Sequence, residues 1–502
     1  MLHLFLLIRM EGEKSFHVFG KKTLKSSQIF IVASIILMTL IITIFCIGFL
    51  MRYEVDTDVS NVASVHYWKD KLTMEQKIWF DKGIKELEAT LSLENGNTKV
   101  KNVIIFVVNG IHPTSLAAVR FLNQNETIKE LSWEKFPYMA RLKSNCNHLK
   151  ICDPFTRATA LFGGVQTNDK VGGLDTAVPF QNCTAAANQT HHIKSVLAHA
   201  QDKGLNTGFI TENRVTGPII AALYAHTPDT NWECDASMPK GELTQKCWDI
   251  AQQLILSETG KKLNVIMGGG RQTMVTNSSI DEFDKVDVDV CNSVDGRNLL
   301  RDWQQQKQTL NLHHKLLMNA QDLNEFSDNK TDYLLGIFTN NYIKSDMNSK
   351  NIAYQMPTLK LMMNKSLDVL KRNARGYLLV VETGDLLPSD VETDLKTLIE
   401  LDELIAESTK SSSLNFADTL VLTVFNSITK ENIKSDLYEE MTGLYKEFPD
   451  IGFSTFLTNK ATETIVYAKG PSAYLLNGLH EETYMAHVIS YALKMGPFSK
   501  SM

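Results

Sequence analysis

The sequence predicts an α/β fold with a mainly parallel central sheet flanked by helices, preceded by one transmembrane helix. Three observations predict it: short β-branched runs, helical patterns between them, and one long uncharged apolar run near the N-terminus. The chain has 502 residues, 43% of them hydrophobic and 22% charged, which is ample for a sizeable core. Its formal net charge of −6 indicates no nucleic-acid partner.

The apolar run covers residues 29–51 and contains no charged side chain. As a helix it would span about 34 Å, enough to cross the hydrocarbon core of a bilayer. Lysines precede the run, whereas Glu54, Asp56 and Asp58 follow it. Because positive charge favours the cytoplasmic side, residues 1–28 are predicted to be cytoplasmic and the rest extracellular or luminal. The prediction is a single-pass type II signal-anchor protein of the plasma membrane or secretory pathway, with a buried core helix as the alternative.

Cysteines and glycosylation sequons fit an oxidising compartment. Besides Cys46 in the apolar run, the chain has an even number of cysteines, which predicts disulfide bonds. Their positions are Cys146, Cys152, Cys183, Cys234, Cys247 and Cys291. Sequons for N-glycosylation begin at Asn125, Asn182, Asn188, Asn277, Asn329 and Asn364. We therefore expect a glycoprotein ectodomain beyond a stalk at 52–64.

Residues 65–496 are predicted to form the ectodomain, followed by a tail at 497–502. Strand-like runs occupy 103–108, 207–211, 263–267, 377–381, 419–423 and 464–467. Helical patterns cover 193–203, 356–373, 391–408 and 484–495. This alternation is typical of a parallel sheet, and active sites in such sheets lie beyond the carboxyl ends of the strands. The residues that follow each run are therefore the candidate site residues.

Seven segments along the chain resemble segments of alkaline phosphatases, in the same order. They are 102–106 (NVIIF), 159–165 (TALFGGV), 221–226 (AALYAH), 247–254 (CWDIAQQL), 265–271 (VIMGGGR), 375–382 (RGYLLVVE) and 468–471 (AKGP). The resemblance implies a fold that covers about 65–496. It also implies a hydrolase of phosphomonoesters, in which two zinc ions and one magnesium ion activate a serine nucleophile.

The positions that carry this chemistry in the family hold other residues here. The serine of the nucleophile turn matches Pro154, after a retained Asp153, and the arginine that clamps the phosphate matches Thr230. Proline has no hydroxyl with which to attack, and threonine cannot form the bidentate fork of a guanidinium. The catalytic residues expected from the family are therefore absent.

The metal ligands of the family are replaced in the same way. Glu382 is the one residual candidate ligand, and the vacated positions have no histidine nearby. Those positions are Asn109, Gly217, Ile219, Leu387, Val391, Asn426, Ser427 and Asn459. Zinc and magnesium need carboxylates and imidazoles, so we expect no metal cofactor.

The resemblance carries two further implications. Cys183 and Cys247 match a disulfide of the family, which leaves Cys146 with Cys152 and Cys234 with Cys291, although the residues alone leave every pairing open. Only about thirty residues, at about 428–458, stand where the family inserts a crown subdomain near its dimer interface. The crown is therefore predicted to be shortened, which weakens the expectation of a homodimer.

These observations predict a membrane-anchored pseudophosphatase that acts as a binding, structural or receptor protein. The alternative is an active phosphomonoester hydrolase with an altered metal site. A third possibility is that the old site binds phosphate-like or glycan ligands without hydrolysing them. The sequence identifies no protein or glycan partner.

Overall fold

A computed structural model gives the fold. It describes residues 16–17, 23–24, 37–40, 43, 72–91, 99–111, 116, 119–120, 130–144, 152–240, 247–278, 284–327, 329–343, 356–385, 391–410, 415–427 and 463–499. The chain divides into two units, Met1–Ala63 and Ser64–Met502. In the first unit, β1 (Phe16–His17) pairs antiparallel with β2 (Thr23–Leu24).

The second unit is built on a sheet of ten strands in the order β12-β4-β11-β10-β3-β9-β5-β6-β8-β7. Their bounds are β3 (Asn102–Ile111), β4 (Tyr138–Lys143), β5 (Asn206–Arg214), β6 (Val265–Gly269), β7 (His314–Leu317), β8 (Tyr333–Ile337), β9 (Tyr377–Glu382), β10 (Thr419–Ser427), β11 (Glu463–Lys469) and β12 (Gly478–Glu481). Only β11 runs antiparallel to its neighbours, β10 and β4. The predicted mainly parallel sheet is confirmed.

Helices connect the strands and cover both faces of the sheet. They are α4 (Met74–Leu91), α6 (Pro154–Gly163), α7 (Cys183–Ala186), α8 (Val196–Asp202), α9 (Pro218–Ala221), α10 (Ile250–Leu256), α11 (Glu258–Lys262), α12 (Arg271–Met274), α13 (Leu299–Thr309), α14 (Ala320–Glu325), α15 (Leu359–Leu370), α16 (Val391–Lys410) and α18 (Tyr484–Ala492). Short 3-10 turns cover Gln189–His191, Asp235–Ser237, Ala473–Leu475 and Gly496–Phe498.

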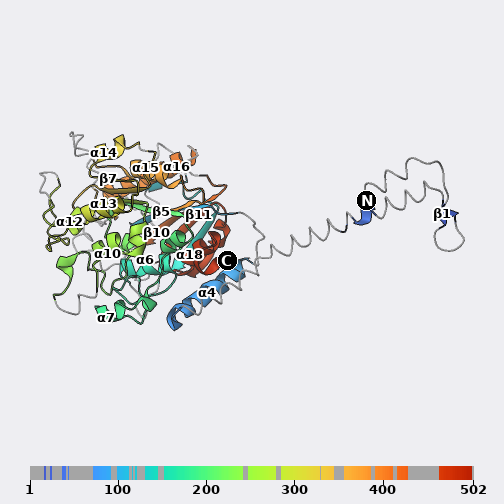
Figure 1. Cartoon of the computed structure of the whole chain (residues 1–502), viewed down its shortest axis with the longest axis horizontal. Helices are drawn as coiled ribbons and strands as arrows, with labels where there is room; N and C mark the ends of the chain where they lie inside the picture. The colour runs from blue at the N-terminus through green and yellow to red at the C-terminus, as the bar shows by residue number, and fades with distance from the viewer. Residues whose placement is uncertain are drawn as a thin grey trace, which may run out of the picture. The chain divides into compact units, whose positions relative to one another are not determined.

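The core consists of two apolar layers, one on each face of the sheet. Along β3, Val103, Ile105 and Val107 join the layer formed with α6, α8, α10 and α18, whereas Ile104 and Phe106 join the layer formed with α15 and α16. Figure 1 shows these two groups of helices on opposite sides of the strands. Because successive side chains of a strand point to opposite faces, an unbroken apolar run such as 103–108 suits a strand buried on both sides.

Helix α4 packs on the body through one stripe of its surface. In the sequence, Ile78, Trp79, Ile84 and Leu87 lie at roughly helical spacing, which predicts a core-packing helix. The buried positions are Gln76, Phe80, Gly83 and Leu87, so the helix is confirmed, but Ile78, 55% exposed, does not belong to the buried stripe. A Cβ atom on Gly83 would lie 2.0 Å from the His487 ring of α18, so glycine permits the close approach of the two helices.

The predicted transmembrane segment, 29–51, lies outside the described residues except for 37–40 and 43, which are helical. Among the residues that the structure describes, no helix has both the length and the apolar character needed to cross a membrane. The predicted crown region at about 428–458 also lies outside the described residues.

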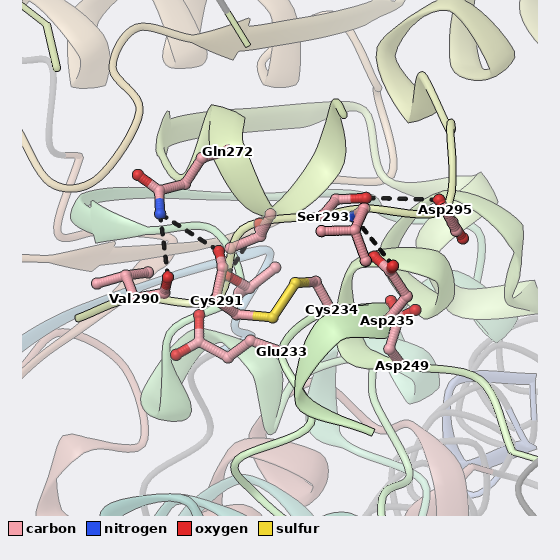
Figure 2. Close-up of a disulfide and its surroundings, with 12 residues drawn as sticks. Glu233, Cys234, Asp235, Asp249, Gln272, Val290, Cys291, Ser293 and Asp295 are labelled. Atoms are coloured by element: carbon pink, nitrogen blue, oxygen red, sulfur yellow. Dashed lines mark hydrogen bonds between the residues drawn. A yellow bond between two sulfur atoms is a disulfide. The ribbon is translucent and has the colours of Figure 1, made fainter. Parts of the chain in front are cut away.

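Disulfides fasten the loops that surround the sheet. Cys183 bonds to Cys247, as the family resemblance implies, and Cys234 bonds to Cys291 (Figure 2). Cys152 is also in a disulfide, whose partner lies outside the described residues.

Candidate functional site

Three of the residues singled out from the sequence lie side by side at the carboxyl edge of the sheet. Asn109 lies near the end of β3, Glu382 ends β9, and Asn426 lies near the end of β10. The register pairs Asn426 with Asn109, and Glu382 with Val107, two residues before Asn109. The topology of the parallel sheet therefore assembles the candidate site.

The Asn109 side chain joins its two neighbours through direct hydrogen bonds. Its Nδ2 donates to Glu382 Oε1 at 3.0 Å, and its Oδ1 accepts from Asn426 Nδ2 at 2.9 Å. Carboxylates at positions 109 and 426 would repel Glu382 and would need a cation between them. The two amides supply both donors and acceptors, so this trio satisfies itself without a cation.

Glu382 is deeply buried, with 2% of the residue exposed. It accepts hydrogen bonds from the Thr211 hydroxyl and the Asn213 amide of β5, in addition to Asn109. Burial, followed by the nearby charge of Asp385, raises the pKa of Glu382 to about 8, although the hydrogen bonds from Thr211, Asn213 and Asn109 oppose the shift. The raised pKa favours the protonated carboxyl group, and the three donors supply the polar contacts that this buried group needs.

The polar network continues through the antiparallel strand β11. Thr464, at the start of β11, pairs with Asn426, and its Oγ1 lies 3.1 Å from Asn426 Oδ1. The same hydroxyl lies 3.0 Å from Glu482 Oε1 and accepts from Arg157 of α6 at 2.7 Å. Thr464, Glu482 and Arg157 are all buried, so one continuous chain of hydrogen bonds runs from Asn109 to α6.

Pro154, at the nucleophile position, is the first residue of α6, and Asp153 is the N-cap of that helix. The Asp153 carboxylate accepts from the backbone N–H groups of Phe155, at 2.8 Å, and Thr156, at 3.4 Å. Thr230, at the clamp position, donates its hydroxyl to the same carboxylate. The structure thus brings the two vacated positions together, and Asp153 occupies the donors at the helix N-terminus.

A second carboxylate lies beside the vacated nucleophile position. Asp169 accepts a hydrogen bond from the Asp153 backbone N–H at 2.9 Å. Burial, followed by the charge of Asp169, raises the pKa of Asp153 above its ordinary value, although its hydrogen bonds oppose the shift. An incoming phosphate group would therefore meet negative charge here without a guanidinium to offset it.

The residues that remain do not fit a zinc or magnesium cluster. Gly217 caps α9, and a Cβ atom there would lie 2.9 Å from the Arg214 carbonyl oxygen, while Ile219 is buried in the apolar core. Leu387, Asn459 and the side chains of Val391 and Ser427 lie outside the described residues. The sequence contains no histidine between 315 and 479, the stretch in which the family resemblance places its zinc histidines. Within the described part of the chain, no three His, Cys, Asp or Glu side chains are grouped as a metal site.

Four residues of the network were missed from the sequence: Thr211, Asn213, Asp385 and Thr464. Thr211 and Asn213 stand at the end of the predicted strand 207–211, and Asp385 follows the predicted strand 377–381 by four residues, so their positions after strands could have identified them. Asp385 Oδ1 accepts from Asn109 at 3.3 Å and from Asn213 at 3.1 Å. Thr464 lies at the N-terminal end of β11. It reaches the carboxyl edge of the parallel strands because β11 runs antiparallel to them.

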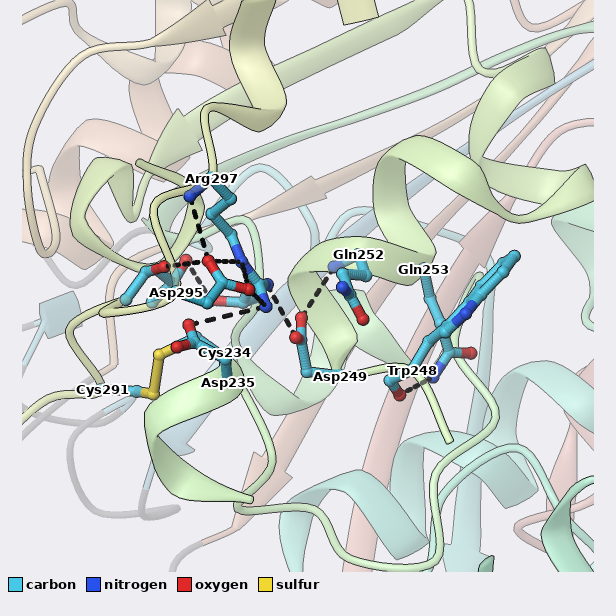
Figure 3. Close-up of polar contacts among 12 residues, drawn as sticks. Cys234, Asp235, Trp248, Asp249, Gln252, Gln253, Cys291, Asp295 and Arg297 are labelled. Atoms are coloured by element: carbon cyan, nitrogen blue, oxygen red, sulfur yellow. Dashed lines mark hydrogen bonds and ion pairs between the residues drawn. A yellow bond between two sulfur atoms is a disulfide. The ribbon is translucent and has the colours of Figure 1, made fainter. Parts of the chain in front are cut away.

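A separate polar cluster surrounds Arg297, beside the Cys234–Cys291 disulfide (Figure 3). The guanidinium pairs with Asp249 at 2.6 Å, Asp295 at 2.6 Å and Asp235 at 3.5 Å. Only 7% of the Arg297 side chain and 1% of the Asp249 side chain are exposed. Burial raises the pKa of Asp249 to about 6 against the pull of Arg297. Burial lowers the pKa of Arg297. The hydrogen bonds and negative charges of Asp295 and Asp249 outweigh burial, so the pKa of Arg297 is raised.

Comparisons with known proteins agree with the fold and with the family resemblance. The family model described as alkaline phosphatase matches residues 100–427. The chain is 29% identical over 476 residues to the human tissue-nonspecific isozyme of alkaline phosphatase, which covers 84% of this chain and 89% of that one. It is 27% identical over 450 residues to a membrane-bound alkaline phosphatase of Bombyx mori, covering 79% of this chain and 80% of that one.

Solved structures support the fold alone, because their sequence identity is low. An alkaline phosphatase from Thermus thermophilus matches with a TM-score of 0.56 at 15% identity, covering 79% of this chain and 92% of that one. An alkaline phosphatase from the Antarctic bacterium TAB5 matches with a TM-score of 0.54 at 14% identity, covering 80% of this chain and 99% of that one.

Proposed function

Because this chain belongs to the alkaline phosphatase family, we propose that it is a pseudophosphatase: a member that keeps the fold and has lost phosphoryl transfer. Its role is that of a binding or structural ectodomain. It is anchored by the apolar segment at 29–51, with residues 65–496 outside the cytoplasm. The absence of cytoplasmic sequons and the presence of disulfides in the second unit support this location.

One observation carries the proposal: the Asn109 amide bonds directly to Glu382 and to Asn426. These three positions match metal ligands in the family. A cation held there would need oxygen atoms directed at it, whereas the N–H group of Asn109 is directed at Glu382. The network replaces the attraction between a cation and carboxylates with hydrogen bonds between uncharged groups, so the fold keeps this edge together without metal.

The nucleophile position supports the same conclusion. Covalent phosphoryl transfer needs a hydroxyl that a metal or base can ionise. Pro154 has none, and the hydroxyl of nearby Thr156 is directed at the backbone carbonyls of Asn168, at 3.3 Å, and Val171, at 3.4 Å. The Thr156 hydroxyl is therefore not available for the role of the missing serine.

Substrate binding at the old site is also disfavoured. Asp153 and Asp169 lie together, and Thr230 uses its hydroxyl on Asp153. A phosphomonoester carries up to two negative charges, so it would be repelled by both carboxylates. The proposed pseudophosphatase accordingly binds its partner through another surface.

Turnover of an aryl phosphate tests this proposal. The full chain, purified in detergent from eukaryotic cells, is assayed at alkaline pH with zinc and magnesium added, beside a known alkaline phosphatase as positive control. We expect no turnover above that of a mock purification. Turnover that is lost in Glu382→Ala, but kept in a substitution of exposed Glu407, would overturn the proposal.

The second candidate function is an active phosphomonoester hydrolase with an altered metal site. It is favoured by the retained carboxylates of Glu382 and Asp153, and by Asp385, which lies beside Asn109. Such an enzyme would use water or another residue in place of the serine. The same assay decides between the two functions, because only the hydrolase predicts turnover that depends on Glu382.

A further inference from the structure

A groove of about 390 Å³ lies between α15 and α16. Leu367 and Leu404, each 3% exposed, form its small apolar floor, and Asp368, Lys371 and the ion-paired Lys360 and Glu407 contribute charged lining. Sites of about 300–1,000 Å³ suit small molecules. The groove therefore combines an apolar surface with hydrogen-bonding groups, which is the chemistry that binds a sugar ring.

Asn364 lines this groove and begins the sequon Asn364-Lys365-Ser366. Its side chain is exposed, and within the described part of the chain its amide makes no hydrogen bond. The next two residues face elsewhere: Lys365 donates to the Asn324 carbonyl at 3.0 Å, and Ser366, fully buried, donates to the Met362 carbonyl at 2.7 Å. Of the three sequon residues, only Asn364 is directed to the groove.

We infer that Asn364 carries an N-linked oligosaccharide whose first sugar residues lie in the groove between α15 and α16. The acetyl methyl group of the first sugar packs on the small exposed part of Leu367 and Leu404. The hydroxyl groups donate to Asp368 and Glu407 or accept from Lys371. This inference rests on the location outside the cytoplasm that the proposed function includes.

The attachment takes place before α15 folds. The Asn364 Nδ2–C1 bond forms as the bond between C1 and the pyrophosphate oxygen of a lipid-linked oligosaccharide breaks. Nδ2 loses one proton, and the lipid pyrophosphate leaves with the electron pair. Recognition of a sequon requires its serine hydroxyl, and Ser366 is 0% exposed in the folded chain. Once the helix has formed, the sugar lies beside its own attachment point, so docking costs little additional ordering.

The glycan has a consequence for partner binding. A sugar in the groove covers the surface between α15 and α16. A protein partner is therefore excluded from this face of the molecule. A partner would instead bind a face without an occupied sequon.

Glycopeptide mass spectrometry of the full chain from eukaryotic cells gives the first test. We expect sugar at Asn364. If other sequons carry sugar and Asn364 is bare, this inference is wrong while the location stands. If no sequon carries sugar, the location itself is wrong, and the inference fails with it.

Release of the glycans by peptide N-glycosidase from the native protein tests docking. We expect release from Asn364 to be about tenfold slower than from exposed Asn188 or Asn329, and equally fast after denaturation. The double variant Asp368→Ala/Lys371→Ala should remove most of this difference, whereas Lys315→Ala, an exposed control, should keep it. Equal release rates in the native parent protein would overturn the docking.

Discussion

The edge network around Asn109 and the cluster around Arg297 both bury carboxyl groups, but they do so in different ways. At the sheet edge, amides and hydroxyls surround Glu382, and among the residues that the structure describes no cationic side chain donates to it. In the loop cluster, one guanidinium pairs with Asp235, Asp249 and Asp295. The first arrangement favours the protonated form of its carboxyl group, whereas the second pairs its carboxyl groups with a cation.

This difference bears on the proposed loss of the metal site. Removing a cation leaves buried carboxylates that repel one another, so the fold is stable only if they are replaced or neutralised. Amides at 109 and 426 meet that need with little change of shape. The Arg297 cluster lacks such replacements, and it depends on its one cation. The two regions should therefore respond in opposite ways to substitution.

The largest effect is expected from Arg297→Met. It leaves Asp249, which is almost fully buried, together with Asp235 and Asp295, without their cation. We expect a loss of about 3–5 kcal/mol in the free energy of unfolding, measured by urea denaturation. Arg301→Met, at an exposed position on α13, should change it by less than about 0.5 kcal/mol. Equal losses in the two variants would show that the cluster does not depend on its arginine.

Asn109→Asp should convert the edge network into a destabilised acidic site. It removes the donor to Glu382 and places a carboxylate beside Glu382 and Asp385. In the presence of a chelator we expect the free energy of unfolding to fall by about 2 kcal/mol. This figure allows for solvent screening, because Asn109 is half-buried. The exposed Asn311→Asp is the matched control. An unchanged stability would contradict the role of the amide.

Thr464→Val tests the middle of the network. It removes the hydroxyl between Asn426 Oδ1, Glu482 and Arg157, and leaves buried groups unpaired. We expect a loss of about 1–2 kcal/mol by the same measurement. Thr423→Val is an internal control, because the Thr423 hydroxyl is buried and has no hydrogen-bond partner in the part of the chain that the structure describes. That variant should be neutral or more stable, and the same loss in both would contradict the network.

Near pH 4.5, Glu382→Gln should have the smallest effect of these variants, and its effect should grow as pH rises. The pKa of Glu382 is raised to about 8 in the fold, so its favourable contribution is complete below about pH 4.5 and is lost as pH rises through 8. Glutamine resembles the uncharged acid, so it should be nearly neutral at low pH. As pH rises from there toward 8, the free energy of unfolding of the variant should increase relative to that of the parent protein, by at most about 1.4 kcal/mol per pH unit. Destabilisation at pH 8 would indicate that Glu382 works as a charged ligand.

The sequence predicted the sheet where its strands are buried on both faces, as in 103–108, 377–381 and 419–423. It missed β4, β7, β8 and β12. All four lie at the sheet edges, two on each side, where short runs are harder to tell from loops. At the site, the rule that active-site residues follow the strands of a parallel sheet predicted Asn109, Glu382 and Asn426. It did not predict Thr464, because the place of Thr464 depends on the direction of β11, which no local pattern specifies. Nor did it predict the pairing of Thr230 with Asp153, which tertiary contacts bring together.

Metal content tests the central claim most directly. The full chain is purified from eukaryotic cells without chelator, and zinc and magnesium are measured by mass spectrometry against protein concentration, beside a known alkaline phosphatase. The edge network predicts neither metal at stoichiometric level, and no change on Glu382→Gln. Stoichiometric zinc that is lost in Glu382→Gln would contradict the account, because it would place a cation where the structure has the Asn109 amide.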